Sequence, residues 1–342
     1  MLKWLRRIAI ALCAIALFVL FAWCNGIQFA LAVATWSFPH SQINAADYIK
    51  DGLCGGKDPC PPADFKVLTF NVLCRVCEKE GYETWDQRVP HLVELIKSYD
   101  PDLLGMQELG GKKDIVDVLG PDSPYDYVTH KFGPWLYADC ALFYKHARFE
   151  LLDSGQIWFS PHPWLPFAFA WKPLSMPRYA NWAILRDRES GLVFLFANTH
   201  FDNNGPNKER TADMFGAILG EASKTIPVIV TGDFNTPPGE DRFRRLLDGG
   251  AILAGEPTPR LMDTATLASN KQIRYVTPED QRPKDWQEFA VETMMIDHII
   301  TGGPEKTEVS RWEINGEAYG GGPWFQPSDH PAIFAEFKLA PQ

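Results

Sequence analysis

Short apolar runs recur along this chain from Phe65 onward, and each of them ends in a polar cluster. They cover residues 66–72, 103–107, 141–144, 192–198, 228–231, 295–300 and 332–337. Their length and their Gly, Pro, Asn or Asp boundaries indicate buried β-strands. Between them, apolar residues in 85–96 and 207–224 repeat at helical steps of three and four. Strands with interspersed helices predict one layered α/β or α+β domain, which we place at 65–342.

The first 36 residues have the features of an export signal. Lys3, Arg6 and Arg7 precede an uncharged apolar run over 8–24, and Ala32-Val-Ala34 offers a cleavage motif. A basic start followed by an apolar core is typical of a signal peptide, and a retained membrane anchor is the alternative. In either case the positive charges predict that the rest of the protein is exported to the periplasm or another extracytoplasmic space.

Residues 37–64 carry several Pro-containing pairs and Gly55-Gly56, and we interpret them as a linker. Cys54 and Cys60 bracket a flexible loop that a disulfide could close, and Cys74-Arg-Val-Cys77 is a C-x-x-C motif. Such a motif is compatible with a redox-active pair, half of a zinc site or a structural bridge. We favour structural bridges, because disulfides persist outside the cytosol. Cys140 then has no partner in these expected disulfides.

Charge and composition exclude some function classes. With 46% hydrophobic and 22% charged residues the chain has a globular balance, which excludes a disordered or fibrous protein. Its net charge of −10 disfavours a dedicated DNA or RNA binder, since Lys and Arg supply most non-specific affinity for phosphate. The aromatic, proline-rich stretch 157–182 predicts a long loop over the core, with a lid or a membrane-facing patch as the alternative.

Polar side chains of similar chemistry follow or open the predicted strands. Side chains two apart on a strand share a face, so such residues can point into one site. Carboxylate and amide oxygens without thiolates suit Mg²⁺ or Mn²⁺, and neighbouring histidines can move protons. This inventory suits metal-assisted attack of water on a phosphoester. The residues are Asn71, Glu108, His200, Asp233, Asn235, Asp297, His298, Asp329 and His330.

These residues lie in motifs that resemble the endonuclease/exonuclease/phosphatase superfamily, in the order of that family and over about 65–338. The motifs are Thr69-Phe-Asn-Val72, Gln107-Glu108, Asn198-Thr-His200, Gly232-Asp-Phe-Asn235, Ile296-Asp-His-Ile299 and Ser328-Asp-His-Pro331. Residues 141–145, 151–155 and 177–182 resemble the exported bacterial branch related to deadenylases and sphingomyelinases. The resemblance implies an α+β fold, a four-layer α/β/β/α sandwich of two packed sheets flanked by helices.

The resemblance also implies a role for each residue. Glu108 is then the main metal ligand, with Asn71 nearby and Asp297 completing the acidic site. Asp233 and Asn235 orient the attacking water and the scissile phosphate, and His200 stabilises the transition state. His330, held by Asp329, transfers a proton or binds phosphate. Arg178 is expected to clamp phosphate, because a guanidinium binds it bidentately, and His298 is placed with the substrate-binding residues.

We therefore expect a Mg²⁺- or Mn²⁺-dependent hydrolase of phosphoesters. The leading hypothesis is an exported phosphodiesterase that acts on a small or lipid-linked phosphodiester, with membrane association through its N-terminal segment. The alternatives are an extracellular nuclease of the same mechanism and a non-catalytic scaffold that binds phosphoesters. The glycine- and aromatic-rich substrate loop of the family is replaced here by residues 274–292. No obligate protein partner is indicated.

Overall fold

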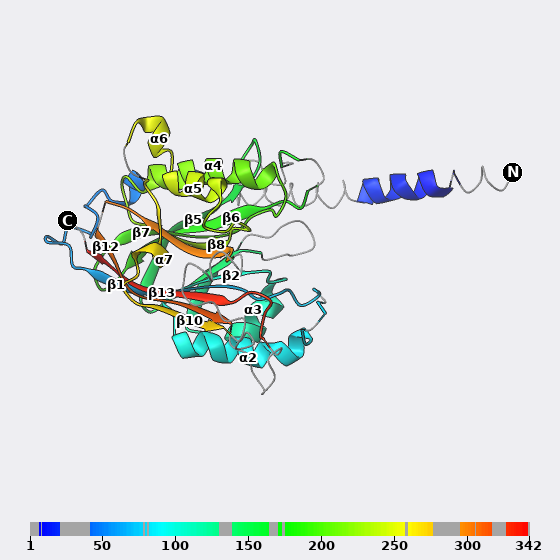
Figure 1. Ribbon diagram of the computed structural model, residues 1–342, viewed down its shortest axis with the longest axis horizontal. Helices are drawn as coiled ribbons and strands as arrows, with labels where there is room; N and C mark the ends of the chain where they lie inside the picture. Colours follow the sequence, from blue (N-terminus) through cyan, green and yellow to red (C-terminus); the bar gives the residue numbers. More distant parts are fainter. Residues whose placement is uncertain are drawn as a thin grey trace.

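The computed structural model describes residues 7, 9–20, 42–77, 79–80, 82–129, 139–163, 170–172, 175–256, 259–275, 295–304, 306–316 and 326–340. Two β-sheets pack face to face, and helices cover their outer faces (Figure 1). This is the predicted four-layer sandwich, and the prediction of the fold class is confirmed.

One sheet has seven strands and the other has six. The seven-stranded sheet runs, in spatial order, β10 (Lys271–Tyr275), β12 (Lys306–Gly316), β13 (Ala332–Ala340), β1 (Ala63–Asn71), β2 (Leu103–Gln107), β4 (Ala141–Lys145) and β3 (Tyr125–Val128). The six-stranded sheet runs β5 (Phe149–Trp158), β6 (Tyr179–Asp187), β7 (Val193–His200), β8 (Val228–Asp233), β11 (Asp297–Gly302) and β9 (Met262–Asp263). The pairs β1–β2 and β7–β8 are parallel, so their carboxyl ends lie together.

Helices α2 (Trp85–Tyr99) and α3 (Lys112–Leu119) lie on the outer face of the seven-stranded sheet, whereas α4 (Asn207–Ala222) and α5 (Asp241–Asp248) lie on the six-stranded one (Figure 1). Short helical turns complete the order: η1 (Ala45–Tyr48), α6 (Ala251–Ala254) and α7 (Thr264–Leu267). Helix α2 begins at a capping box, in which Thr84 N donates to Gln87 Oε1 at 3.2 Å. The predicted helical repeats at 85–96 and 207–224 correspond to α2 and α4.

Three apolar clusters fill the spaces between the four layers. One lies between the two sheets and includes Phe65, Phe194 and Ile333. The second packs α4 and α5 on the six-stranded sheet, and the third packs α2 and α3 on the other. Because both faces of each sheet are covered, β7 is buried at every position. Its sequence is therefore a continuous apolar run rather than an alternating one.

The segment interpreted as a linker packs against the domain over its described residues. Ala45 and Cys54 are buried, and Leu53 O accepts a hydrogen bond from Val193 N at 3.0 Å. Strand β1 begins at Ala63, inside the interval assigned to the linker. Residues 42–62 are therefore a covering strap and not a free tether, because they bury apolar side chains and pair with the end of a strand.

The aromatic stretch 157–182 is only in part the loop that was expected. Its first residues end β5 and its last residues begin β6, where Trp158 and Trp182 are buried. Residues 164–169 and 173–174 lie outside the described part. Proline does not exclude strands here, because Ile157 and Trp158 pair with Ala180 and Tyr179, away from the prolines.

The cysteines form two short-range disulfides, Cys54–Cys60 and Cys74–Cys77. Of the described cysteines, Cys13 and Cys140 are free. Residues 9–20 are helical and exposed, and no helix in the described part of the chain is long and apolar enough to span a bilayer. The remainder of the predicted leader lies outside the described residues.

Candidate active site

Strand pairing brings the predicted residues to one edge of the sandwich. In the six-stranded sheet, Asp233 lies opposite His200 on the parallel strand β7 and opposite Asp297 on the antiparallel strand β11. In the other sheet, the ends of β1 and β2 pair Asn71 with Gln107. The carboxyl ends of the parallel pairs in both sheets thus converge on one place.

Asn71 links the two halves of the site. Its side-chain nitrogen donates to Glu108 Oε1 at 3.2 Å and to Asp233 Oδ2 at 3.1 Å, and its oxygen accepts from Leu73 N at 3.2 Å. Glu108 has a φ of 68°, an uncommon backbone conformation that turns the chain out of β2. In this conformation Asn71 presents nitrogen to the two carboxylates and positions Glu108 and Asp233. Its expected role as a metal ligand stays a prediction.

Asp233, Asp297 and His330 form the acidic centre of the site. One ligand atom of each lies within 4.8 Å of the others. Burial raises the pKa of Asp297, which also lies beside the charge of Asp233. Burial opposes the ionisation of Asp233 too, but His200 and His330 outweigh it and lower its pKa. Asp297 Oδ1 is buried and has no hydrogen-bond partner among the described residues.

His330 is oriented by Asp297 and not, as predicted, by Asp329. His330 Nδ1 lies 2.7 Å from Asp297 Oδ2, whereas Asp329 Oδ2 accepts from Lys79 Nζ at 2.6 Å. Adjacent residues direct their side chains differently, so Asp329 faces the loop after β1. Burial alone would lower the pKa of His330, but Asp297 and Asp233 overcome it and raise the pKa to about 10.

Asp139, which the sequence analysis did not single out, orients His200. It receives hydrogen bonds from the backbone of Glu108 at 3.0 Å and from Arg178 Nη1 at 2.9 Å, and it lies 3.2 Å from His200 Nδ1. His200 Nε2 lies 3.4 Å from Asp233 Oδ2. Burial opposes a charge on His200, but Asp139 and Asp233 outweigh it and raise its pKa. Arg178 therefore contacts the site indirectly, by its hydrogen bond to Asp139.

A buried polar layer below these residues joins the sheets. Gln107 Nε2 donates to Asn198 Oδ1 at 2.6 Å, and Thr231 Oγ1 donates to the same oxygen at 3.0 Å. Gly105 leaves room for this contact, because a Cβ there would lie 2.0 Å from Thr231 Oγ1. These bonds fix the spacing of the two sheets directly beneath the acidic centre.

Comparison with known proteins agrees with this geometry. Residues 68–330 match the Endonuclease/Exonuclease/phosphatase family. The chain belongs to this family. Nocturnin of Xenopus laevis is 30% identical over 213 residues, which cover 54% of this chain and 51% of that protein. The chain spans about half the length of these curated relatives.

Two solved structures from Bacteroides thetaiotaomicron share the fold. One is an endonuclease/exonuclease/phosphatase family protein, with a TM-score of 0.65 and 22% identity over 81% of this chain and 96% of that one. The other is a mannosyl-6-phosphatase, with a TM-score of 0.64 and 22% identity over 80% of this chain and 99% of that one. These structures confirm the sandwich architecture, and the family match over residues 68–330 confirms the resemblance seen in the motifs.

His298 does not take part in the family's site here. It is fully buried, its Nδ1 lies 2.9 Å from Asp263 Oδ2, and its Nε2 lies 3.0 Å from the Thr236 carbonyl oxygen. Its ring packs on Phe243 of α5. The expected substrate-binding role is wrong, because Asp297 points into the site and the next residue of a strand points to the opposite face.

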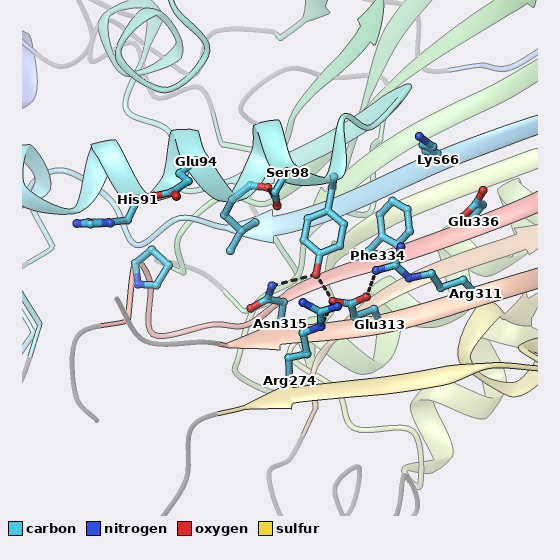
Figure 2. Close-up of a pocket in the computed structure, with 13 residues that line it drawn as sticks. Lys66, His91, Glu94, Ser98, Arg274, Arg311, Glu313, Asn315, Phe334 and Glu336 are labelled. Atoms are coloured by element: carbon cyan, nitrogen blue, oxygen red, sulfur yellow. Dashed lines mark hydrogen bonds and ion pairs between the residues drawn. The ribbon is translucent and has the colours of Figure 1, made fainter. Parts of the chain in front are cut away.

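A cavity of about 370 Å³ opens beside the acidic centre. Asn235, whose backbone nitrogen donates to Asp233 Oδ1 at 2.9 Å, lies at its rim with His330. The other lining residues combine cations, acids and an apolar wall. They include Lys79, Lys208, Arg242, Glu240, Asp329, Met295, Ile296 and Ile314, and Lys79 and Arg242 are paired with Asp329 and Glu240. A larger cavity of about 680 Å³ lies under α2 and contains none of the predicted site residues (Figure 2).

The donor set at this edge fits a hard divalent cation. Glu108 and Asp297 offer carboxylate oxygens, and the partnerless Asp297 Oδ1 is a buried acceptor that a cation would satisfy. Asp233 and His330 each place a ligand atom within 4.8 Å of one on Asp297. A metal there would also offset the repulsion between the buried charges of Asp233 and Asp297.

Proposed function

We propose that this protein is a divalent-metal-dependent phosphodiesterase for small or lipid-linked phosphoesters. The observation that carries the proposal is the gathering of Asp233, Asp297 and His330 within 4.8 Å, one asparagine side chain away from Glu108. Water attack on a phosphoester needs positive charge at the phosphoryl oxygens, an oriented water and a proton donor, and these residues offer each of them.

Glu108 and Asp297 would hold Mg²⁺ or Mn²⁺, which when bound supplies charge that polarises the phosphoryl group. Asp139 and Asp233 flank His200 and raise its pKa, which favours the imidazolium form, and this form would donate a hydrogen bond to a phosphoryl oxygen. Asp233 is held as a carboxylate and is the group best placed to orient the attacking water. His330, oriented by Asp297, is the second proton-transfer group.

A small substrate agrees with the size and the lining of the site. The cavity of about 370 Å³ is of ligand-pocket size, and its lining places Lys208, together with Lys79 paired to Asp329, beside an apolar wall. The net charge of −10 does not favour a long polyanion. The similar Bacteroides structure titled a mannosyl-6-phosphatase also suggests a small phosphoester. The N-terminal apolar run and the two disulfides support an exported protein that associates with a membrane.

The test uses the full-length protein with bis(p-nitrophenyl) phosphate, p-nitrophenyl phosphate, single-stranded RNA, single-stranded DNA and phosphatidylcholine vesicles. We expect turnover of the diester with Mg²⁺ or Mn²⁺, none with EDTA, and loss of turnover in Glu108→Gln. Faster and salt-sensitive cleavage of RNA or DNA would replace the small-substrate proposal with a nuclease. Absence of metal-dependent release from all five substrates would favour a phosphoester-binding scaffold.

A further inference from the structure

The loop between β1 and α2 carries a disulfide next to Glu108. Cys74, which is buried, is bonded to Cys77, which is exposed. Cys74 N donates to Glu108 Oε2 at 3.0 Å. The two sulfur atoms and a carboxylate oxygen of Glu108 all lie within 4.8 Å of one another. The two sulfur atoms therefore lie beside the carboxylate of Glu108, which is also an expected metal ligand of the active site.

We propose that reduction of the Cys74–Cys77 disulfide creates a zinc-type cation site formed by Cys74, Cys77 and Glu108. A dithiol or phosphine supplies two electrons, the S–S bond breaks, and two thiols form. The reductant becomes a disulfide or, with an oxygen atom from water, a phosphine oxide. Each thiol releases its proton to solvent when it binds the cation. Thiolates select soft or borderline cations, whereas Glu108 with other oxygens selects hard ones.

The geometry requires only a short movement. Zn–S bonds are about 2.3 Å and Zn–O bonds about 2.0–2.2 Å, so tetrahedral ligand atoms are about 3.7 Å apart. Once the S–S bond is broken, the sulfurs can separate to that distance by a shift of Cys77. That side of the turn is not packed, since Val76 is 83% exposed. Three protein ligands leave the fourth position for water.

Contacts other than the disulfide keep Cys74 beside Glu108. Arg75 Nε donates to Asp114 Oδ1 at 2.7 Å, which ties the loop to α3. Arg88 Nη2 of α2 donates to the carbonyl oxygen of Leu73 at 2.7 Å. Because neither bond involves a sulfur atom, reduction breaks neither of them, and the ligands remain organised for a cation. The oxidised loop, in contrast, offers no thiolate.

The other disulfide provides a matched control. Cys54 and Cys60 are also close in sequence and bonded, but among the described residues no His, Asp or Glu joins them in a three-ligand group. The new site goes beyond the proposed hydrolase function. Only its expected effect on turnover, loss of Glu108 to the softer cation, rests on that function.

The first test adds Co²⁺ to full-length protein that a phosphine has reduced and that has been freed of reductant. We expect a thiolate-to-cobalt charge-transfer band in reduced wild type and in the Cys54→Ser/Cys60→Ser variant. The band is expected to be absent from oxidised wild type and from Cys74→Ser/Cys77→Ser. Co²⁺ held only by oxygen and nitrogen has no such band, so the active-site metal does not interfere. A reduced wild type without the band would overturn the proposal, as would a band that survives in Cys74→Ser/Cys77→Ser.

A second test needs no variant and so does not depend on one folding. Zn²⁺ at about 100 times its Kd leaves about 1% of the site free, so alkylation of reduced Cys74 and Cys77 should slow about 100-fold. Mass spectrometry of peptides is expected to show unchanged rates at Cys54 and Cys60. Equal rates with and without zinc at Cys74 and Cys77 would refute the site. Neither test measures turnover, so failure of the hydrolase proposal would leave both results interpretable.

Discussion

Two clusters of charged side chains, each built around at least one buried carboxylate, lie in different parts of this molecule. They differ in how the negative charge of the carboxylates is compensated. Under α2, Glu313 is fully buried, and Arg274 Nε contacts its Oε1 at 2.9 Å while Arg311 binds its other oxygen (Figure 2). Tyr99 OH also donates to Glu313 and accepts from Asn315 Nδ2. Every oxygen of this carboxylate has a protein partner.

At the active-site edge, by contrast, two buried carboxylates face each other with imidazoles as the nearest cations. Asp233 and Asp297 are opposite one another across β8 and β11, and Asp297 Oδ1 has no hydrogen-bond partner within the described structure. Burial of an acid therefore does not by itself indicate function. The active-site cluster differs because it contains a carboxylate oxygen, Asp297 Oδ1, that no donor of the described chain satisfies and that is therefore open to a ligand.

The largest effect is expected from Asp233→Asn, which removes a charge from the active-site cluster but keeps an oxygen acceptor. Turnover of bis(p-nitrophenyl) phosphate should fall about 10³–10⁴-fold, equivalent to about 4–5.5 kcal/mol in the barrier. The melting temperature should fall only modestly, because His200 and His330 favour the Asp233 carboxylate and its loss outweighs the relief of repulsion with Asp297. Steady-state kinetics and thermal unfolding on one preparation measure both. Retained activity with a large loss of stability would make this cluster structural, like that of Glu313.

The next largest effect is expected from metal binding, which should stabilise the protein through the active-site cluster and not through the cluster around Glu313. Mg²⁺ at about 100 times its Kd should raise the free energy of unfolding by about 2.7 kcal/mol in wild type and in Glu313→Gln. The gain should largely disappear in Asp297→Asn, because that substitution removes a charged ligand. Urea unfolding with Mg²⁺ and with EDTA measures the difference. An equal gain in wild type and Asp297→Asn would place the cation elsewhere.

The parts of the site that could be predicted from sequence are those with local signals. Asn71, His200 and Asp233 follow apolar runs that form parallel strands, and parallel strands bring their carboxyl ends to one edge. Asp139 could not be found in this way, because it precedes the antiparallel strand β4, whose beginning lies at that same edge. Its partner His200 is 61 residues away.

The errors also have physical causes. His298 was grouped with Asp297 because the two are adjacent, yet adjacent positions on β11 face opposite sides of the sheet. Glu313 lies on strand β12, where charged and apolar residues alternate less regularly than on an amphipathic strand. No local pattern indicates the hydrogen bond between Glu313 and Tyr99, which are 214 residues apart. The sandwich itself was predictable because the buried runs that build most of both sheets are each marked locally.

A smaller effect, on stability alone, is expected from Glu313→Gln. The loss should be about 2 kcal/mol, since charged hydrogen bonds disappear and two arginines lose their partner. The side chains of Arg274 and Arg311 are 47% and 33% exposed, so water compensates part of the cost. Urea unfolding measures the loss, with Glu336→Gln in the same cavity as the control. Turnover should be unchanged, and a coupled fall in turnover would contradict the separation of the two clusters.

An effect of similar size, on activity, tests how Asp139 acts on its neighbour. Asp139→Asn should lower kcat/KM about 10–100-fold, the usual cost of losing an orienting partner. Asp139 and Asp233 raise the pKa of His200, so the wild-type imidazole keeps its proton to a higher pH than a free histidine does. Without the charge of Asp139 the proton is lost at lower pH, and the alkaline limb of kcat/KM should move to lower pH. The matched control is Asp187→Asn, another buried carboxylate, whose partner Arg148 lies 3.2 Å away. It should leave the profile in place. A limb that stays in place in Asp139→Asn while kcat/KM falls would show that Asp139 only positions the ring.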